Sequence, residues 1–497
     1  SLTRGAMTKA EELFRGRTFN DFLLEPQYSQ LTTRADPQRK MLRMPLTRNI
    51  WLSWPIIAAN MDTVTSRRMM KTTSLEGAFA FLPRSNSIEE QCAMVDWVKR
   101  QHSFIITSPA KIHQNATVDE ARKLAAFHHT SCLLIESVPG SNILVGILSK
   151  RDMRAGLQEN PGKKVLKFMT ELPKLKVAGP DIDIEDAEKI MNRLRIEKLP
   201  LVGRGHIIAG LVTMKDIEMA KQKPYSVKDK KGRLMVGASI GATGDFLERA
   251  AELIEHGADC ILIDIAHFDS ISGRTATKSF RRKFPNVELI GGNIATGSAA
   301  RHALSWGVDA AKVGIGPGKG CRTRLETGFG KAQVEAIREV YRAVGNEIPI
   351  IADGGMENDK DFALATFAGA STSMVGSMLA GTDEAPGIVR EDPATKQKIK
   401  IYRGMTSPQA VIDRVRDEDD LADALMTPAE GQPVQVPYIG SVVDVLQRIA
   451  GHMQSAVSFS GFTTLHEAHT HIANPRNVKK YFGAWLSQAS QIESYKR

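Results

Sequence analysis

Cysteine, aromatic residues and long apolar runs are all scarce in this sequence of 497 residues. Its four cysteines, Cys92, Cys132, Cys260 and Cys321, are too few and too scattered for a disulfide framework, and no CxxC pair suggests zinc. No stretch reaches the roughly 18 apolar residues that span a bilayer. The residues before Met7 lack the apolar centre of a secretion signal. We therefore expect a cytoplasmic protein with reduced thiols and no membrane partner.

A large excess of one charge is also missing. The 66 Lys and Arg residues exceed the 56 Asp and Glu residues by a formal net charge of +10, and the densest basic runs, residues 228–233 and 281–283, are short. Aromatic residues, which stack on bases in single-strand binding proteins, make up 6% of the chain. Nucleic acid is therefore a disfavoured partner, and a surface that meets phosphate-bearing small molecules explains the charge more simply.

Short apolar segments alternate with helical patterns after residue 233. The candidate strands are residues 234–240, 260–265, 287–290, 310–313, 348–352 and 373–375. Their continuous apolar character is typical of a parallel sheet that is buried on both faces, and residues 245–256 carry the apolar stripe of an amphipathic helix. With the apolar segment 54–60 (WPIIAAN), about eight β-α units fit. The pattern predicts an α/β fold, a (β/α)8 or TIM barrel, rather than a doubly wound sheet.

An internal sequence repeat interrupts this pattern. Residues 146–152 read GILSKRD and residues 210–216 read GLVTMKD, and each segment follows an apolar run and introduces a helix. A candidate amphipathic helix precedes each of them, at residues 118–126 and 184–194. Such self-similarity indicates a duplication. We expect the barrel to begin with residues 7–104, a duplicated α/β insertion to occupy residues 105–222, and the barrel to resume and finish with residues 223–497.

Polar or glycine-rich residues end the candidate strands. These ends are residues 60–62 (NMD), 264–267 (DIAH), 291–293 (GGN), 314–321 (GIGPGKGC), 353–355 (DGG) and 376–377 (GS). Active sites of (β/α)8 barrels lie at the carboxyl ends of the strands, so the six segments are predicted to form one site. Glycine amides in the last two segments suit a phosphate, and Asp353 suits ribose hydroxyls. The implied ligand is a nucleoside monophosphate.

The glycine loop 314–321 ends in Cys321 and is neither a Walker loop nor a Rossmann fingerprint. Arg322 and Arg324 follow the cysteine, and nearby cations favour the thiolate, which is the nucleophilic form. We predict that Cys321 is a nucleophile. The other three cysteines are expected to be small buried residues: Cys92, Cys132 and Cys260.

These segments resemble the IMP dehydrogenase / GMP reductase family over nearly the whole chain. The matching segments are residues 60–65 (NMDTVT), 264–267 (DIAH), 292–296 (GNIAT), 312–323 (KVGIGPGKGCRT), 351–355 (IADGG), 375–382 (VGSMLAGT) and 402–405 (YRGM). The internal repeat resembles the tandem cystathionine-β-synthase-type (CBS, or Bateman) pair that is inserted in this family's barrel. The resemblance implies a purine-nucleotide effector at that pair and a homotetramer or octamer.

The resemblance also implies roles for single residues. Cys321 would attack C2 of the purine ring, with Thr323 and Glu430 as further catalytic residues and NADPH or NAD as the hydride carrier. The implied substrate-binding residues are Asn60, Met61, Asp353, Gly355, Gly376, Ser377, Tyr402, Gly404 and Met405. The implied cofactor-binding residues are Asp264, His267 and Asn293, and the carbonyls of Gly316, Gly318 and Cys321 would line a potassium site. Lys319 stands where the family usually has Ser, and it would meet phosphate or solvent.

The two activities of the family differ after the covalent step. A dehydrogenase oxidises IMP with NAD and then hydrolyses a covalent XMP intermediate, and the family uses an Arg-Tyr pair on a flap for this. The corresponding stretch, residues 406–429, has Val415 between Arg414 and Arg416, and valine cannot transfer a proton. The acidic residues 417–420 (DEDD) would favour ion pairs with those arginines.

A reductase converts GMP and NADPH to IMP, ammonia and NADP, and it needs an acid–base group near the 2-amino group. Thr323 and Glu430 fit that need, and Asn60 before Met-Asp resembles reductases. His267, the YRGM segment and the insertion resemble dehydrogenases instead. We expect a GMP reductase, with IMP dehydrogenase as the alternative. A nucleotide-sensing pseudoenzyme is a further reading, which the intact Cys321, Thr323 and Glu430 argue against.

Overall fold

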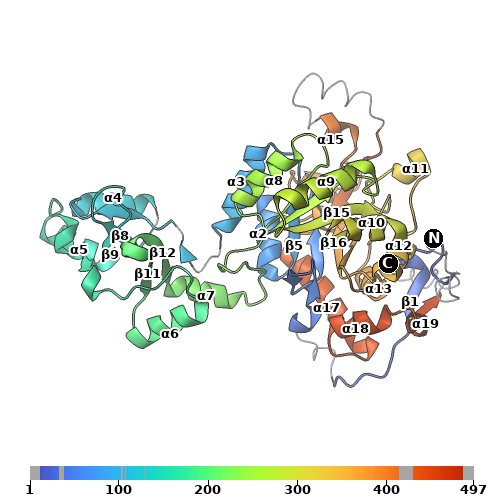
Figure 1. Cartoon of the computed structure of the whole chain (residues 1–497), viewed down its shortest axis with the longest axis horizontal. Helices are drawn as coiled ribbons and strands as arrows, with labels where there is room; N and C mark the ends of the chain where they lie inside the picture. Colours follow the sequence, from blue (N-terminus) through green and yellow to red (C-terminus); the bar gives the residue numbers. More distant parts are fainter. Residues whose placement is uncertain are drawn as a thin grey trace. The chain divides into compact units, whose positions relative to one another are not determined.

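The structure, a computed structural model, describes residues 12–32, 39–101, 105–106, 108–128, 130–412 and 429–484 (Figure 1). The chain divides into two units. The barrel unit comprises Ser1–Lys99, Tyr225–Val227 and Leu234–Arg497, and the second unit comprises Arg100–Pro224 and Lys228–Arg233. The second unit is therefore an insertion in the sequence of the barrel unit.

Eight parallel strands close the barrel, and the α/β barrel predicted from the sequence is confirmed. In order around the barrel they are β13 (Gly237–Ile240), β14 (Cys260–Asp264), β15 (Glu288–Ile294), β16 (Ala310–Val313), β17 (Ile350–Asp353), β18 (Thr372–Val375), β4 (Ile56–Ala58) and β5 (Phe79–Leu82), which pairs with β13. Nearly every residue of these strands is buried, because helices cover the outer face and side chains fill the interior.

Two strand glycines make room for aromatic rings in this core. A Cβ on Gly237 would lie 2.6 Å from the Phe81 ring, and a Cβ on Gly291 would lie 2.3 Å from Cζ of Phe268. Phe81 and Phe268 are fully buried. Glycine at these positions is required by packing, since any side chain would displace a ring from a close-packed interior.

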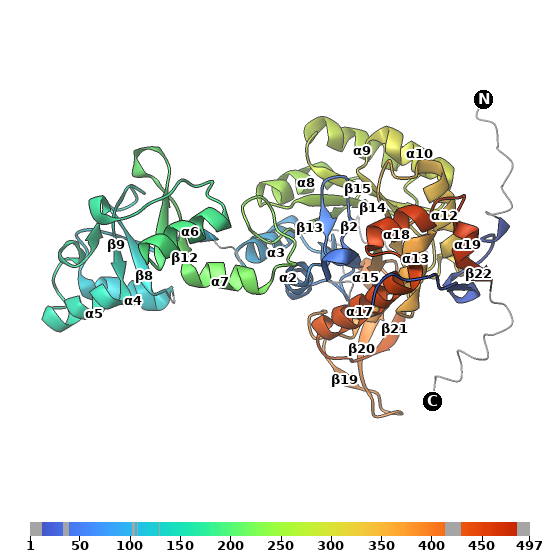
Figure 2. The ribbon, with the colours of Figure 1, turned by 90° about the horizontal axis from the view of Figure 1, so that it is seen from below.

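Helices follow the barrel strands and cover the outside of the barrel. They are α2 (Arg67–Glu76), α3 (Ile88–Lys99), α8 (Phe246–Glu255), α9 (Ile271–Lys283), α10 (Gly297–Trp306), α12 (Gln333–Val344) and α13 (Lys360–Ala368). Two shorter helices, α11 (Thr323–Thr327) and α14 (Ser377–Ala380), come after β16 and β18. Ser66, Ser270 and Thr296 start three of the longer helices by accepting hydrogen bonds from backbone N–H groups of the first turn. Helix α17 (Val442–Ser460) packs on α2 and α13, and α18 (Leu465–Ile472) packs on α13 (Figure 2).

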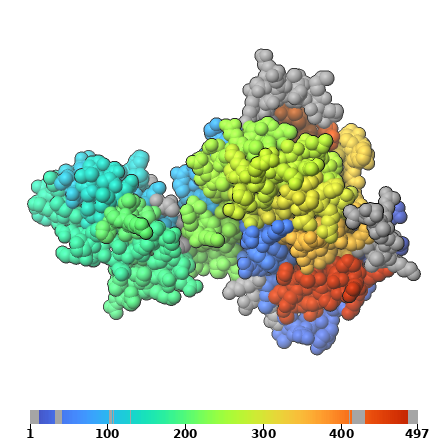
Figure 3. All heavy atoms as spheres, viewed as in Figure 1, coloured from blue at the N-terminus to red at the C-terminus, as the bar shows by residue number. Residues whose placement is uncertain are grey.

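The two ends of the described chain meet on the barrel unit. Strand β1 (Phe22–Leu24) pairs antiparallel with β22 (Phe482–Ala484), and the early and late residues lie side by side in Figure 3. The rings of Phe14, Phe22 and Phe482 pack together with centroids 5.1–5.4 Å apart. The barrel unit is therefore complete only when its last described strand is in place.

A small antiparallel sheet lies beyond α14. It contains β19 (Arg390–Glu391), β20 (Lys398–Arg403) and β21 (Pro433–Pro437). Lys400 on β20 is buried, and its ammonium donates to the carbonyls of Thr382 at 2.9 Å and Ala385 at 2.7 Å. These bonds anchor β20 to the segment that follows α14.

The second unit consists of two halves with the same order of elements. The first half has α4 (Val118–Phe127), β8 (Cys132–Glu136), β9 (Leu144–Ser149) and α5 (Lys150–Glu159), and the second has α6 (Ile184–Leu194), β11 (Lys198–Val202), β12 (Ile208–Thr213) and α7 (Met214–Gln222). Strands β7 (Lys111–His113) and β10 (Thr170–Glu171) flank β8 and β9, while β6 (Ile105–Ile106) pairs with β12. The assignment of this unit as a CBS pair stays a prediction.

The internal sequence repeat has a local physical explanation. Ser149 begins α5 by accepting a hydrogen bond from the Asp152 N–H, and its hydroxyl donates to the Asp152 carboxylate. Thr213 and Asp216 make the same pair of bonds at the start of α7. The motif shared by both halves is thus a strand end followed by an N-cap and an acidic first turn.

In the part of the chain that the structure describes, no helix has the length and apolarity that crossing a bilayer requires. Helix α17, the longest helix in this part of the chain, is amphipathic: its buried residues lie on one face and polar residues lie on the other.

Two glycine-to-alanine changes should have opposite effects on stability. Gly291→Ala should lower the unfolding free energy by about 1–3 kcal/mol, because its methyl group overlaps the buried Phe268 ring. Gly451→Ala on α17 should raise it by about 0.5–1 kcal/mol, since no atom lies within 4 Å of the added methyl group and alanine favours helix. Thermal and denaturant unfolding measure both. Equal stability of Gly291→Ala and the parent protein would contradict the packing described for Phe268.

Candidate active site

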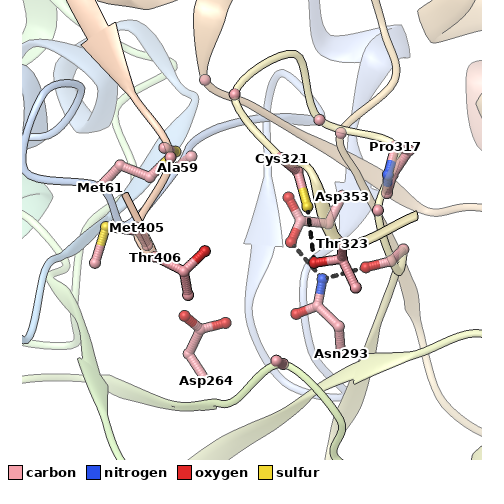
Figure 4. A pocket seen from close by; sticks show the side chains of 18 of the residues that line it. Ala59, Met61, Asp264, Asn293, Pro317, Cys321, Thr323, Asp353, Met405 and Thr406 are labelled. Atoms are coloured by element: carbon pink, nitrogen blue, oxygen red, sulfur yellow. Dashed lines mark hydrogen bonds between the residues drawn. The ribbon is translucent and has the colours of Figure 1, made fainter. Parts of the chain in front are cut away.

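A pocket of about 240 Å³ opens at the carboxyl ends of the barrel strands (Figure 4). The loop after β16 and the segment around Gly404 complete its wall. The predicted site residues that line it are Asn60, Met61, Asp264, Asn293, Gly316, Gly318, Cys321, Thr323, Asp353, Gly376, Tyr402, Gly404, Met405 and Glu430. The convergence of the strand ends therefore places most of the predicted residues in one cavity.

Four residues singled out from the sequence lie outside the wall of this pocket, as far as the described residues define it. Gly355 packs behind the wall against Pro317 and Gln333, so it supports the glycine loop. Ser377 is the first residue of α14, directly after Gly376 in the wall. The side chains of His267 and Lys319 are exposed, which places Lys319 toward solvent rather than in the cavity.

Cys321, Thr323 and Glu430 form a hydrogen-bonded relay. The Cys321 thiol donates to Oγ1 of Thr323 at 3.2 Å, and the Thr323 hydroxyl donates to Oε2 of Glu430 at 2.7 Å. Figure 4 shows the cysteine and threonine on the wall opposite Met61 and Met405. A thiol proton can move along this relay toward the carboxylate, which is what the activation of a nucleophile requires.

Backbone hydrogen bonds bring Glu430 to the cysteine loop from a distant part of the sequence. The Arg322 N–H donates to the Glu430 carbonyl at 2.7 Å, and the Gln432 N–H donates to the Gly320 carbonyl at 3.0 Å. The Gly404 N–H donates to the Gln432 carbonyl at 3.1 Å. The relay thus depends on three chain segments that are held together by their backbones. The predicted flap residues Arg414, Val415 and Arg416, with residues 417–420, lie outside the described residues.

A buried lysine lies at the floor of the pocket. Lys312 on β16 has 3% of its side-chain surface exposed, and its ammonium contacts Oδ1 of Asp264 at 2.8 Å and Oδ2 of Asp353 at 2.5 Å. It also donates to Oδ1 of Asn293 at 2.5 Å. Asn60 donates to the other oxygen of Asp264 at 2.9 Å. These bonds fix the orientation of both carboxylates.

Burial and neighbouring charges have opposing effects on the pKa values of Asp264 and Lys312. Burial raises the pKa of the Asp264 carboxyl, but the Lys312 charge and the hydrogen bonds from Lys312 and Asn60 outweigh it, so that pKa lies below its ordinary value. Burial lowers the pKa of Lys312, but Asp264 and Asp353 raise it more, so it lies above its ordinary value. Both groups therefore stay charged at neutral pH.

Tyr402 stays protonated in the pocket wall. Burial raises the pKa of its phenol well above the ordinary value, and the nearby Asp353 and Cys321 raise it further. The hydroxyl donates to the Met61 sulfur at 3.5 Å, a weak acceptor that a ligand oxygen could replace. A Cβ on Gly376 would lie 2.8 Å from this hydroxyl, so glycine there leaves room for the phenol.

Arg324 supports the glycine loop from behind. Its Nε donates to the Ile315 carbonyl at 3.1 Å, and Nη2 donates to the Lys331 carbonyl. Its side chain occupies the space where a Cβ on Gly316 would lie, 2.5 Å from its Cγ. The backbone of Gly316 has φ +77°, so both space and conformation require glycine at this position.

The loop offers uncharged backbone oxygens of the kind that a monovalent cation accepts. The carbonyl of Gly318 accepts the Cys321 N–H at 2.9 Å and keeps a second lone pair. No group of three or more His, Cys, Asp or Glu residues in the described ranges could hold a metal ion. The donor set is therefore compatible with potassium and unsuited to zinc.

Sequence reasoning missed two charged residues of the pocket wall, Lys312 and Arg84. The sequence carries a signal for Lys312, because it is the one charged residue in the strand sequence AAKV and adjoins the predicted glycine loop. Its partners lie on three other strands, so its role becomes visible only when the barrel closes. Arg84 follows β5, whose carboxyl end is not among the six predicted segments.

Comparisons with known proteins agree with these features. The sequence model of the IMP dehydrogenase / GMP reductase domain matches residues 16–494. Inosine-5'-monophosphate dehydrogenase of Nitrosopumilus maritimus is 40% identical over 463 residues, 91% of this chain and 94% of that protein. The enzyme of the same name from Aquifex aeolicus is 37% identical over 462 residues, 92% of each chain. A GMP reductase from Trypanosoma brucei, solved with guanosine 5'-monophosphate, has a TM-score of 0.81 at 33% identity and covers 98% of this chain and 99% of its own.

The four thiols should differ sharply in reactivity. Burial raises the pKa of Cys92 to about 11 and raises the pKa of Cys132 and of Cys260, so these thiols carry little thiolate near neutral pH. Cys321 is partly exposed in the pocket. Iodoacetamide at about pH 8 should therefore label Cys321 first, as read by peptide mass spectrometry. Preferential labelling of Cys92 or Cys260 in the folded protein would contradict this burial pattern.

Proposed function

Because this chain belongs to the IMP dehydrogenase / GMP reductase family and is an oxidoreductase of that family, we propose that it acts on a purine nucleoside monophosphate at C2 through a covalent bond to Cys321. The observation that carries this proposal is the relay from Cys321 through Thr323 to Glu430 in the pocket wall. A nucleophile next to a hydroxyl and a carboxylate suits addition to an electron-poor ring carbon.

The nucleotide would occupy the side of the pocket formed by β17, β18 and β20. Asp353 would accept hydrogen bonds from ribose hydroxyls, while backbone amides at Gly376 and Ser377 would meet the phosphate. The protonated phenol of Tyr402 would donate to the same ligand, and Gly404 and Met405 would contact the base. Asn60 and Met61 would close the opposite wall over the purine.

The chemical step would begin with transfer of the Cys321 proton toward Glu430 by way of Thr323. The resulting thiolate would attack C2 and form the covalent bond to sulfur. A bound nicotinamide supplies or accepts the hydride at C2. Asp264 and Asn293 would hold it through their oxygen and amide groups, with Lys312 keeping the Asp264 carboxylate ionised and oriented.

For the direction of the reaction, the sequence relatives favour IMP dehydrogenase, the alternative in the sequence analysis, over the expected reductase. The Nitrosopumilus maritimus protein named inosine-5'-monophosphate dehydrogenase is 40% identical along 91% of this chain. We therefore place first the conversion of IMP, NAD and water to XMP and NADH. Glu430, reached through the Thr323 hydroxyl, could accept a proton from the attacking water.

GMP reductase is the second candidate, and a specific observation favours it. The relay that ends at Glu430 also suits protonation of ammonia as it leaves C2, and Val415 cannot act as the tyrosine of a hydrolytic flap. The Trypanosoma brucei GMP reductase structure is similar over nearly the whole chain. In this direction GMP, NADPH and a proton would give IMP, ammonia and NADP.

The second unit and the assembly complete the proposal. The repeated helix–strand–strand–helix order supports a CBS pair at residues 105–222, between barrel segments at residues 7–104 and 223–497, with a purine nucleotide as effector. A structure of the Trypanosoma brucei enzyme in complex with guanosine 5'-triphosphate supports such an effector, at 31% identity and a TM-score of 0.72. A homotetramer or octamer, and potassium at the carbonyls of Gly316, Gly318 and Cys321 to order the loop, follow from the family resemblance.

A paired assay tests the direction of the reaction. The purified protein should form NADH from NAD when IMP is supplied, as followed by absorbance, and XMP should accumulate. Oxidation of NADPH with GMP and release of ammonia, without the first reaction, would make the reductase correct. Cys321→Ala should remove either activity while IMP and GMP still bind, because only the nucleophile is lost. Normal turnover by that variant would exclude the covalent mechanism.

Breaking the relay should affect catalysis more than binding. Thr323→Val and Glu430→Gln should each lower kcat by about 10²–10⁴-fold, since they remove a proton path, and leave the KM for nucleotide within about threefold. Thr395→Val, a matched change at an exposed threonine in the turn between β19 and β20, should leave both constants unchanged. Equal rates for Thr323→Val and Thr395→Val would show that the relay takes no part in the reaction.

A further inference from the structure

Lys312 contacts two acids that face the pocket. The side chains of Asp264 and Asp353 are 21% and 20% exposed, whereas that of Lys312 is 3% exposed. The two acids therefore present more surface to a ligand than the lysine does. The three partners of Lys312 come from β14, β15 and β17, so a single ammonium from β16 connects three other strands.

The ammonium has no capacity for a further partner. It has three hydrogens, and the structure gives it three oxygen acceptors on Asp264, Asn293 and Asp353. Strengthening one contact must weaken another, because the same charge and the same hydrogens are shared. In a partly buried group such changes are large, since little water is present to compensate them.

The two acids face different ligands, and here the inference rests on the proposed function. Asp353 would accept the ribose hydroxyls of the nucleotide, and Asp264 would meet the nicotinamide cofactor. Asn293 links Asp353 to Lys312 a second time, because its Nδ2 donates to Oδ2 of Asp353 at 2.8 Å while its Oδ1 accepts from Lys312. Binding at one site can therefore affect binding at the other although neither acid contacts the other's ligand.

We propose that Lys312 is a positioning residue that couples the nucleotide site to the cofactor site through its shared contacts with Asp353 and Asp264. A change at Asp264 moves the ammonium toward or away from Asp353 and thereby alters how well Asp353 accepts ribose hydroxyls. The reverse follows by thermodynamic reciprocity. Occupation of one site then sets the acceptor strength of the other without motion of the backbone.

Removing the charge at Asp264 tests the coupling. In Asp264→Asn the ammonium is held by Asp353 more strongly, so Asp353 becomes a weaker acceptor and the Kd for IMP should rise by about threefold or more. The measurement is calorimetric titration of the free protein with IMP and with GMP, without cofactor. In Lys312→Met, adding Asp264→Asn should leave the Kd unchanged, because the connection is gone.

The sign of the effect separates this coupling from long-range electrostatics. Loss of one negative charge near a dianionic nucleotide would by itself tighten binding, and it would do so with either residue at position 312. An unchanged or lower Kd in Asp264→Asn, or an equal rise in the Lys312→Met background, would overturn the proposal. Binding of neither IMP nor GMP to the parent protein would overturn the proposed function as well.

Matched variants control for stability. Lys312→Arg keeps the charge and a forked set of donors, so Asp264→Asn should again raise the Kd in that background. Lys99→Met removes another buried lysine, which pairs with Asp259 at 2.7 Å outside the pocket, and it should not alter the effect of Asp264→Asn. If Lys312→Met is too unstable to purify, Lys312→Gln serves the same cycle, because it removes the charge while its amide still donates.

Discussion

The active-site architecture depends on one buried positive charge between two carboxylates. Lys312 has its ammonium within 2.8 Å of Asp264 and Asp353, and the cost of desolvating the three charged groups is offset by their mutual attraction and their hydrogen bonds. Removing one partner from such a cluster typically costs about 3–5 kcal/mol, since the remaining charges are left uncompensated. The strand ends that carry these residues are therefore held in register by electrostatics as well as by backbone pairing. The cysteine loop follows directly on β16, so its position depends on the same anchor.

The amount that the sequence can predict differs between strands and contacts. The strand predicted at residues 310–313 has the bounds that the structure has, because four buried residues follow one another. The strand predicted at residues 287–290 continues to Ile294, because Gly291 and Gly292 are inside the strand and leave space for Phe268 and Lys312. Glycine pairs usually indicate a turn, and only the neighbouring elements show that here they accommodate packing.

The candidate site likewise contains residues that local sequence signals identify and residues that they do not. Cys321 is identifiable from its glycine loop and its basic neighbours, which are local signals. Glu430 is assigned by family resemblance, because nothing near it in the sequence indicates that its carboxylate reaches Thr323. Lys312 escapes prediction as a site residue, since one lysine in an apolar strand has no local partner. Contacts between strand ends depend on closure of the barrel, and a local pattern does not contain that information.

The position of the second unit in the chain has a consequence for synthesis on the ribosome. Strand β5 pairs with β13, and the whole of the second unit lies between them in sequence. All of the second unit's strands and helices emerge before β13 does, so this unit can fold while β5 still lacks β13 and β4 still lacks β18. Strand β5 (Phe79–Leu82) gains its second neighbour when β13 has been made, whereas β4 (Ile56–Ala58) gains its second neighbour only with β18, at Thr372–Val375. The barrel unit therefore cannot be complete until β22 has been made and can pair with β1.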